Sequence, residues 1–171
     1  MSRVTRPIRI AGSAAYVPLT RGYVAVIDAG DVSLVAGHNW SALVSKRRKA
    51  VYAARVVTDG RKQTMVLMHR LVSSAPVGMV VDHIDGDGLN NRRSNIRHCT
   101  RAQNNLNVGL RGDSTSRLKG TSLDKRVNRW KAEIGLGGKR KFLGYFETPE
   151  LAHAAYAAAA AEVHGEYARC K

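Results

Sequence analysis

A run of 27 residues, Val81 to Asn107, is rich in side chains that perform acid–base and metal chemistry. It reads VDHIDGDGLNNRRSNIRHCTRAQNNLN and holds three Asp, two His and six Asn. Phosphodiester cleavage needs a base that makes a nucleophile from water and a cation that neutralises charge at the phosphate. His83 can serve as the base, because an imidazole titrates near neutral pH. Asp82 and Asn104 offer hard oxygen ligands that suit Mg²⁺, and Asn95 can orient the imidazole.

Two short strands and a helix are expected to position these side chains. The apolar residues 77–81 predict a strand that ends beside the Asp-His pair, and residues 95–99 predict a second strand. The loop between them contains two glycines, which allow the chain to bend. Thr100 is a favoured N-cap residue, so residues 101–107 are predicted to form a helix. The sequence therefore predicts a β-hairpin and a helix that converge on one small site.

These residues and their spacing resemble the HNH nuclease motif, the ββα-metal finger, in the form found in phage and intron-encoded homing endonucleases. The resemblance implies that Asp82 binds a metal, that His83 is the general base and that Asn95, twelve residues later, orients it. It implies that Asn104 completes the metal site, although its neighbour Asn105 is left open as the ligand. It also implies a divalent metal, with Mg²⁺ favoured over Mn²⁺ or another ion, and products with 5′-phosphate and 3′-hydroxyl ends.

Two other interpretations of this run were weighed. Asn, Asp and Gly are common in solvated turns, but the ordered Asp-His, Asn and Asn positions favour a catalytic site. The DGDG sequence at 85–88 superficially resembles a calcium loop. An EF-hand loop would need Asp or Asn at position 89 and Glu at position 96, where this chain has Leu89 and Ile96. The two acids of DGDG are therefore predicted to be turn residues.

The charge of the chain favours a polyanionic partner. Its 171 residues carry a net charge of +15. Residues 1–63 hold 11 Lys or Arg against 3 Asp or Glu, whereas residues 64–107 hold 5 against 3. No run approaches the ~18 apolar residues of a spanning helix, and the first residues lack the apolar region of a signal peptide. We therefore expect a polyanionic partner and no membrane. The resemblance implies that this partner is double-stranded DNA and that the protein is encoded by a phage and acts in the cytoplasm of its bacterial host. We expect a monomer.

The region before the hairpin is predicted to be a β-rich leader. Residues 1–15 are basic with little periodicity and predict an arm that either follows a DNA groove or is a solvated tail. Strands are expected at 22–28, 40–44 and 50–58, and a short helix is expected within 31–40.

The Met-His-Arg-Leu sequence at 68–71 resembles the segment that precedes the nuclease motif in phage HNH proteins. His69 is therefore a secondary candidate for the site. Its role is either a phosphate contact or a structural histidine bonded within the core.

The carboxy-terminal third has its own pattern, after a Gly- and Ser-rich linker at 108–118. Residues 129–136 alternate between apolar and polar side chains, Gly137-Gly138 is a hairpin signal, and residues 139–146 predict the returning strand. Thr148-Pro149-Glu150 predicts a helix start and Gly165 its end. Leu151, Ala155, Ala158 and Glu162 share helical spacing, which predicts close packing on the sheet.

This part resembles the AP2 DNA-binding domain in the segments WKAEI at 130–134, FLGYF at 142–146 and AAY at 154–156. In that family the sheet face lies in the major groove of DNA. Leu123 and Gly135 depart from positions that are often aromatic or Arg in that family, which puts sequence-specific readout in doubt. The residues expected to contact DNA, including those near the nuclease motif, are Arg47, Arg48, Arg92, Arg93, Arg97, Arg126, Arg129, Lys131, Glu133, Arg140 and Phe142.

We therefore expect an α+β protein with two domains. The first, 16–107, is an HNH nuclease domain whose ββα-metal motif spans 77–107. The second, 119–171, is an AP2-like three-stranded antiparallel sheet packed on one helix. The expected function is a metal-dependent homing endonuclease that nicks or breaks duplex DNA. The alternative is an AP2-type DNA-binding regulatory protein with an inactive HNH fold. An RNA-binding protein ranks last, because no aromatic stacking platform is evident.

Overall fold

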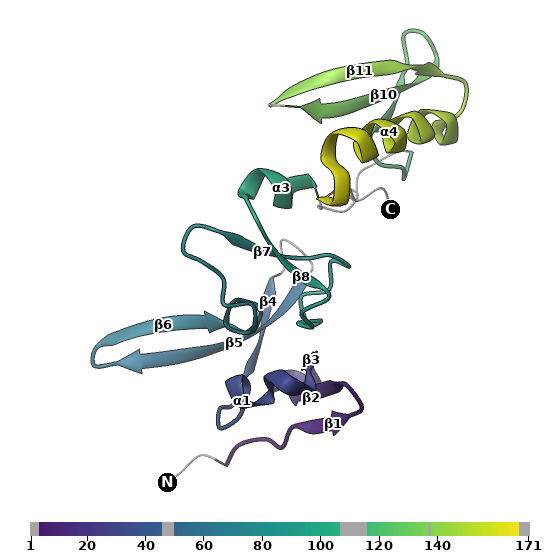
Figure 1. Cartoon of the computed structure of the whole chain (residues 1–171). Coiled ribbons are helices and arrows are strands. Elements are labelled where there is room, and N and C mark those ends of the chain that lie inside the picture. The colour runs from purple at the N-terminus through teal and green to yellow at the C-terminus, as the bar shows by residue number, and fades with distance from the viewer. Residues whose placement is uncertain (1–3, 46–49, 107–115, 137, 168–171) are drawn as a thin grey trace. The chain divides into compact units, whose positions relative to one another are not determined.

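The computed structural model describes residues 4–45, 50–106, 116–136 and 138–167. The chain divides into two compact units, Met1–Arg101 and Ala102–Lys171. The first contains several small antiparallel sheets and short helical segments, and the second contains one such sheet with a long helix, so the expected mixture of α and β structure is confirmed (Figure 1). Among the described residues, no helix is long and apolar enough to cross a membrane.

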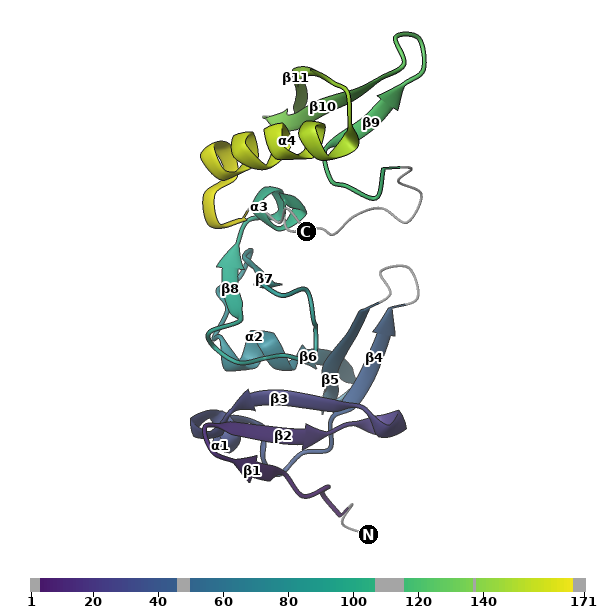
Figure 2. The same ribbon diagram turned by 90° about the vertical axis from the view of Figure 1, so that its right-hand side faces the viewer.

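The first unit begins with a three-stranded antiparallel sheet. Its strands are β1 (Arg9–Ala11), β2 (Ala14–Pro18) and β3 (Val24–Asp28), with β2 in the middle (Figure 2). Ala15 and Val17 on β2 and Ala25 and Ile27 on β3 are buried, which follows from the alternation of side chains along a strand. Part of the expected basic arm, 1–15, therefore forms strands, because backbone pairing with β3 and burial of small apolar residues order it.

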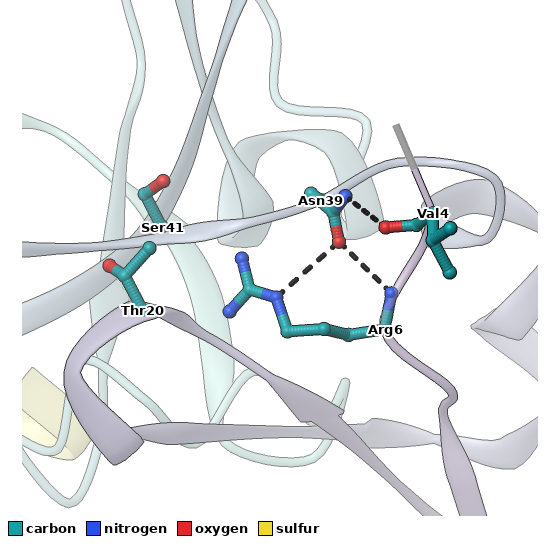
Figure 3. A pocket seen from close by; sticks show the side chains of 5 residues that line it. All are labelled: Val4, Arg6, Thr20, Asn39 and Ser41. Carbon is teal, nitrogen blue, oxygen red and sulfur yellow. Dashed lines mark hydrogen bonds between the residues drawn. The ribbon is translucent and has the colours of Figure 1, made fainter. Parts of the chain in front are cut away.

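Asn39 fixes the segment that precedes β1. Its Oδ1 accepts hydrogen bonds from the backbone amide of Arg6 at 3.0 Å and from Arg6 Nε at 3.4 Å, and its Nδ2 donates to the carbonyl of Val4 at 2.9 Å (Figure 3). With Thr20 and Ser41, these residues line a pocket of about 300 Å³. The Arg6 side chain, which belongs to the expected basic arm, therefore makes hydrogen bonds within the fold.

A second three-stranded antiparallel sheet follows. Its strands are β4 (Ser41–Ser45), β5 (Ala50–Asp59) and β6 (Lys62–Leu67), in that order (Figure 1). The strand expectations at 40–44 and 50–58 are thus confirmed. Short helical segments lie within the first sheet, between the two sheets, and between the second sheet and the hairpin. They are η1 (Thr20–Gly22), η2 (Ala29–Asp31), α1 (Val32–Val35) and α2 (Met68–Val72).

Trp40 lies in the core of the first unit. Its side chain has no exposed surface, and its indole N–H donates to the carbonyl of Val35 at 3.0 Å. Ile27, Met68 and Val72 are equally buried in the same cluster. One apolar cluster therefore joins the first sheet to the helical segments.

The expected hairpin and helix of the nuclease motif are present. They are β7 (Val80–His83), β8 (Ile96–Cys99) and α3 (Arg101–Leu106). The first strand begins at Val80 rather than at Val77, which is fully exposed. The guanidinium of Arg70 donates to three carbonyls in the segment 75–79, including that of Met79 at 2.8 Å, and holds this approach as a turn.

The second unit contains one antiparallel sheet and one long helix (Figure 2). Its elements are β9 (Thr121–Asp124), β10 (Arg129–Leu136), β11 (Lys139–Phe146), α4 (Pro149–His164) and η3 (Gly165–Tyr167). Strand β10 lies between β11 and β9, and its hairpin with β11 closes at Leu136 and Lys139. The Thr148 hydroxyl caps α4 by accepting from the amide of Leu151 at 3.3 Å, and Gly165 ends the helix with φ of 52°.

The buried face of α4 differs from the expected one. Leu151 is 53% exposed, whereas Ala152, Tyr156 and Ala160 are buried. The buried stripe is thus shifted by one residue, because Tyr156 packs with Ile134 in the core of this unit. The expectation that the face of Leu151, Ala155, Ala158 and Glu162 packs on the sheet was therefore wrong in register.

Gly120 provides a test of this packing. A Cβ at Gly120 would overlap the ring of Tyr156, and its φ of 77° is unfavourable for other residues. We expect Gly120→Ala to lower the free energy of unfolding of this unit by about 2 kcal/mol or more, measured by urea denaturation. The control is Gly135→Ala, whose Cβ would meet nothing within 4 Å. If the two variants were equally stable, the proposed contact with Tyr156 would be wrong.

Candidate active site

His83 ends strand β7 and is almost completely buried, with 6% of its surface exposed. The ring of His69 lies edge-on to it, with centroids 5.0 Å apart, and the ring of Tyr52 lies 6.0 Å away. Burial lowers the pKa of His83 below its ordinary value of 6.5, although its hydrogen bond with Asn91 Oδ1 and the charges of nearby aspartates oppose this. His83 is therefore neutral at pH 7 and able to accept a proton.

His69 is brought next to His83, as the Met-His-Arg-Leu segment indicated. Burial, and to a smaller extent the charges of His83 and Arg70, lower its pKa to about 3. A neutral imidazole with 6% of its surface exposed is poorly suited to bind a phosphate by charge. The geometry therefore favours the structural role over the phosphate contact.

Asp82 faces Arg97 across the hairpin, where the two residues are paired in the antiparallel register. Arg97 Nη2 lies 2.9 Å and Arg97 Nε lies 3.1 Å from Asp82 Oδ2. Both side chains are largely buried, with 12% of Arg97 and 6% of Asp82 exposed. Arg97 was expected to contact DNA, but this ion pair places it inside the hairpin.

Asn95 holds the loop that joins β7 to β8. Its Nδ2 donates to Asp85 Oδ1 at 2.9 Å and to the carbonyl of Asn90 at 2.8 Å, and its Oδ1 accepts from the amide of Asp85 at 3.1 Å. These bonds connect both ends of the loop. Any influence of Asn95 on His83 therefore acts through the loop, and its orienting role stays a prediction.

Asn91 was not singled out from the sequence. It is completely buried, and its Oδ1 lies 3.4 Å from His83 Nε2. In the sequence it is one of six Asn in the same polar run, and no spacing rule distinguishes it from Asn90. Its position against the imidazole depends on contacts to β3, which are remote in the chain.

The donor chemistry around Asp82 fits a cation that takes few protein ligands. Mg²⁺ typically uses one or two carboxylates and keeps water or phosphate oxygens in its other positions. Among the residues that the structure describes, no three His, Cys, Asp or Glu side chains group as a metal site. A cation at Asp82 must also share the carboxylate with Arg97 or displace it. Asn104 is partly buried and Asn105 is exposed on α3, in the other unit, so their roles as ligands stay predictions.

Two further arginines near the motif already have carboxylate partners. Arg92 Nε lies 2.9 Å from Asp28, and Arg93 Nη2 lies 2.8 Å from Asp31. Their side chains remain 36% and 56% exposed, so a phosphate contact stays a prediction. Arg47 and Arg48 lie outside the described residues.

In the second unit, the sheet face opposite α4 carries most of the expected DNA contacts. Glu133 is paired with Lys131 at 3.1 Å and with Arg140 at 3.6 Å, so its negative charge is compensated. Phe142 is half exposed, and its ring meets that of Tyr145 at 5.0 Å. The remaining candidates are Arg126, which pairs with Asp124, and Arg129, which pairs with Glu147. Tyr145, which sequence reasoning missed, donates to Asp124 at 2.9 Å.

Comparisons with known proteins agree with the nuclease motif. The sequence model of the HNH endonuclease family matches residues 67–106, which include both the hairpin and the Met-His-Arg-Leu segment. Protein 3.8 of Escherichia phage T7 is 32% identical over 94 residues, which cover 55% of this chain and 77% of that protein. No solved structure gives a significant match. The family match ends at residue 106, before the sheet and the long helix of the second unit, so their AP2 resemblance stays a proposal. The chain belongs to the family of phage T7 protein 3.8 and carries an HNH endonuclease domain.

Proposed function

We propose that this protein is a metal-dependent DNA endonuclease of the homing type, with His83 as its general base. The HNH match, which indicates endonuclease activity on DNA, includes His83. The observation that carries the proposal is a buried, neutral imidazole at the end of β7, which directly follows the buried Asp82 in the strand. This pairing supplies a proton acceptor and a hard ligand at one position of the hairpin.

In the proposed reaction, His83 removes a proton from water, and the water oxygen attacks phosphorus in line with the departing oxygen. The bond between phosphorus and the 3′ oxygen breaks as the new bond forms, which gives a 5′-phosphate and a 3′-hydroxyl. Asp82 and Asn104, or Asn105 in its place, would hold a divalent ion, for which Mg²⁺ is favoured. When bound, such an ion stabilises the charge on the phosphate and on the leaving oxygen. Asn95 keeps the loop in shape.

The second unit is proposed to bind duplex DNA as an AP2-like module. Support comes from its basic sheet face, on which Lys131 and Arg140 compensate Glu133 and Phe142 is exposed. A basic face of this kind attracts the phosphate backbone whatever the sequence. The proposed setting is the cytoplasm of a bacterial host infected by a phage. A monomer with one nuclease site would cut one strand at a time.

A DNA-binding regulator with an inactive nuclease fold is the second candidate. The ion pair between Asp82 and Arg97 favours it, because the guanidinium lies where a cation would be needed. The two candidates differ in whether bound DNA is cut.

His83→Ala is expected to abolish nicking of a supercoiled plasmid that carries DNA from the protein's own genomic neighbourhood. Removal of a general base typically costs about 10²- to 10⁴-fold in rate, while retardation of the same DNA in a gel should persist. His38→Ala is the matched control, because His38 is exposed in the same unit. Equal cleavage by His83→Ala would contradict the assignment of the base. Retarded but uncut DNA with the native protein, across Mg²⁺, Mn²⁺ and Ni²⁺, would favour the regulator.

Metal removal tests the role of Asp82. EDTA should stop nicking, and titration with Mg²⁺ or Mn²⁺ should restore it. Asp82→Asn keeps the shape of the side chain but removes its negative charge. We expect this variant to need about 10- to 100-fold more metal to reach the same rate of nicking. Asp59→Asn, in the exposed turn of β5 and β6, should titrate like the native protein. Full activity in EDTA, or a normal titration for Asp82→Asn, would exclude this role.

Two neighbouring residues on β11 test the DNA face. Arg140→Gln removes a positive charge from the sheet face that carries Glu133. Lys141→Gln also removes one positive charge, but from the next position of β11, which is paired with buried Ile134. We expect Arg140→Gln to weaken DNA binding and to reduce the slope of log K against log salt by about 1. Lys141→Gln should change neither quantity, as measured by fluorescence anisotropy at several salt concentrations. Equal effects of the two variants would count against a specific DNA face.

A further inference from the structure

The contact between Asn91 and His83 concerns the protonation of the imidazole as well as its position. Asn91 has no exposed surface, and its Oδ1 lies 3.4 Å from His83 Nε2. Because Asn91 is fully buried, its side chain cannot exchange this contact for bulk water without a change in the loop. The identity of the atom that Asn91 presents therefore decides which ring nitrogen carries a proton.

The carboxamide of Asn91 is oriented by the loop itself. Its Nδ2 donates to the carbonyl of Leu89 at 2.9 Å, and its backbone amide donates to the carbonyl of Val26 at 2.7 Å. A carbonyl oxygen can only accept, so Nδ2 is the amide atom that faces Leu89. The oxygen of the carboxamide is thereby left to face His83.

An amide oxygen is an acceptor and requires a donor from its partner. His83 Nε2 meets this requirement only if it carries a hydrogen. A neutral imidazole has one N–H, so the proton on Nε2 leaves Nδ1 unprotonated. The proton acceptor of the ring is then Nδ1.

We infer that Asn91 is a positioning residue that selects the Nε2–H tautomer of His83 and so makes Nδ1 the basic nitrogen. The consequence for catalysis rests on the proposed function, in which His83 is the base. The tautomer itself does not depend on that function. Asn91 acts through His83 and need not touch the substrate.

Two other residues near His83, Asn95 and His69, do not supply this selection. The side-chain hydrogen bonds of Asn95 go to Asp85 and to the carbonyl of Asn90. His69 meets His83 edge-on at 89°, and its own buried Nδ1 makes no hydrogen bond within the described structure. An edge contact limits where the ring lies but does not specify which nitrogen is protonated.

The first experiment measures the tautomer in the native protein, so it needs no variant that folds poorly. Long-range ¹H–¹⁵N correlation spectra at pH 7 distinguish protonated from unprotonated imidazole nitrogens. The spectrum of His83→Ala identifies the signals of His83 among those of the six histidines. A proton on Nε2 and none on Nδ1 is the expected result. A proton on Nδ1 would overturn the inference.

The second experiment removes the acceptor. Asn91→Leu keeps similar volume without the oxygen, and should lose the tautomer preference and lower kcat by about 10- to 100-fold with little change in KM. Asn91→Asp keeps an acceptor and should retain the Nε2–H tautomer. Asn90→Ala, which removes the neighbouring amide and its bond to Asp85, should retain it too. An unchanged kcat or tautomer in folded Asn91→Leu would overturn the inference.

If His83→Ala still cleaves while native His83 holds its proton on Nε2, the proposed base fails but the role of Asn91 in the tautomer stands.

Discussion

The arrangement of the nuclease motif depends on two backbone hydrogen bonds between the β7–β8 loop and β3. The amide of Val26 donates to the carbonyl of Leu89 at 2.9 Å, and the amide of Asn91 donates back to the carbonyl of Val26 at 2.7 Å. Together they form a short parallel bridge at Val26 and Asn90. A loop of this length would otherwise be costly to order. Because Asn91 lies within this bridge, the surroundings of His83 are set by a strand about sixty residues earlier in the chain.

Charged side chains reinforce the same connection. Asp28, at the end of β3, accepts from the guanidinium of Arg92 and from the backbone amide of Arg93, whose side chain pairs with Asp31. Burial alone would raise the pKa of Asp28, but the hydrogen bonds from Arg93 and Arg92 lower it overall. The carboxylate therefore stays charged at neutral pH, and the pairing is maintained. The amino-terminal sheet thus serves as the scaffold of the active hairpin.

The sequence predicts those features that depend on near neighbours in the chain. The cap of α4 at Thr148, the hairpin of β10 and β11, and the order of β7, β8 and α3 all follow from local patterns. The partners of Arg92, Arg93 and Arg97 do not, because a basic side chain near a nuclease motif has the same sequence signature whether it meets DNA or an aspartate. Asn91 was missed for a similar reason, since its role arises from tertiary contact with β3. The buried face of α4 was misplaced because alanine periodicity in a helix rich in alanine does not single out one face.

The ion pair between Asp82 and Arg97 limits the ions that the proposed metal site could hold. A buried carboxylate without a partner is strongly destabilising, and Arg97 offsets that cost when no cation is present. An incoming ion must therefore compete with a guanidinium that already makes two hydrogen bonds to one carboxylate oxygen. A singly charged ion would bring no more charge than Arg97 does, whereas a divalent ion brings twice as much to the same carboxylate. For the proposed metal site, this difference in charge favours a divalent over a monovalent cation, before any phosphate oxygen contributes to binding.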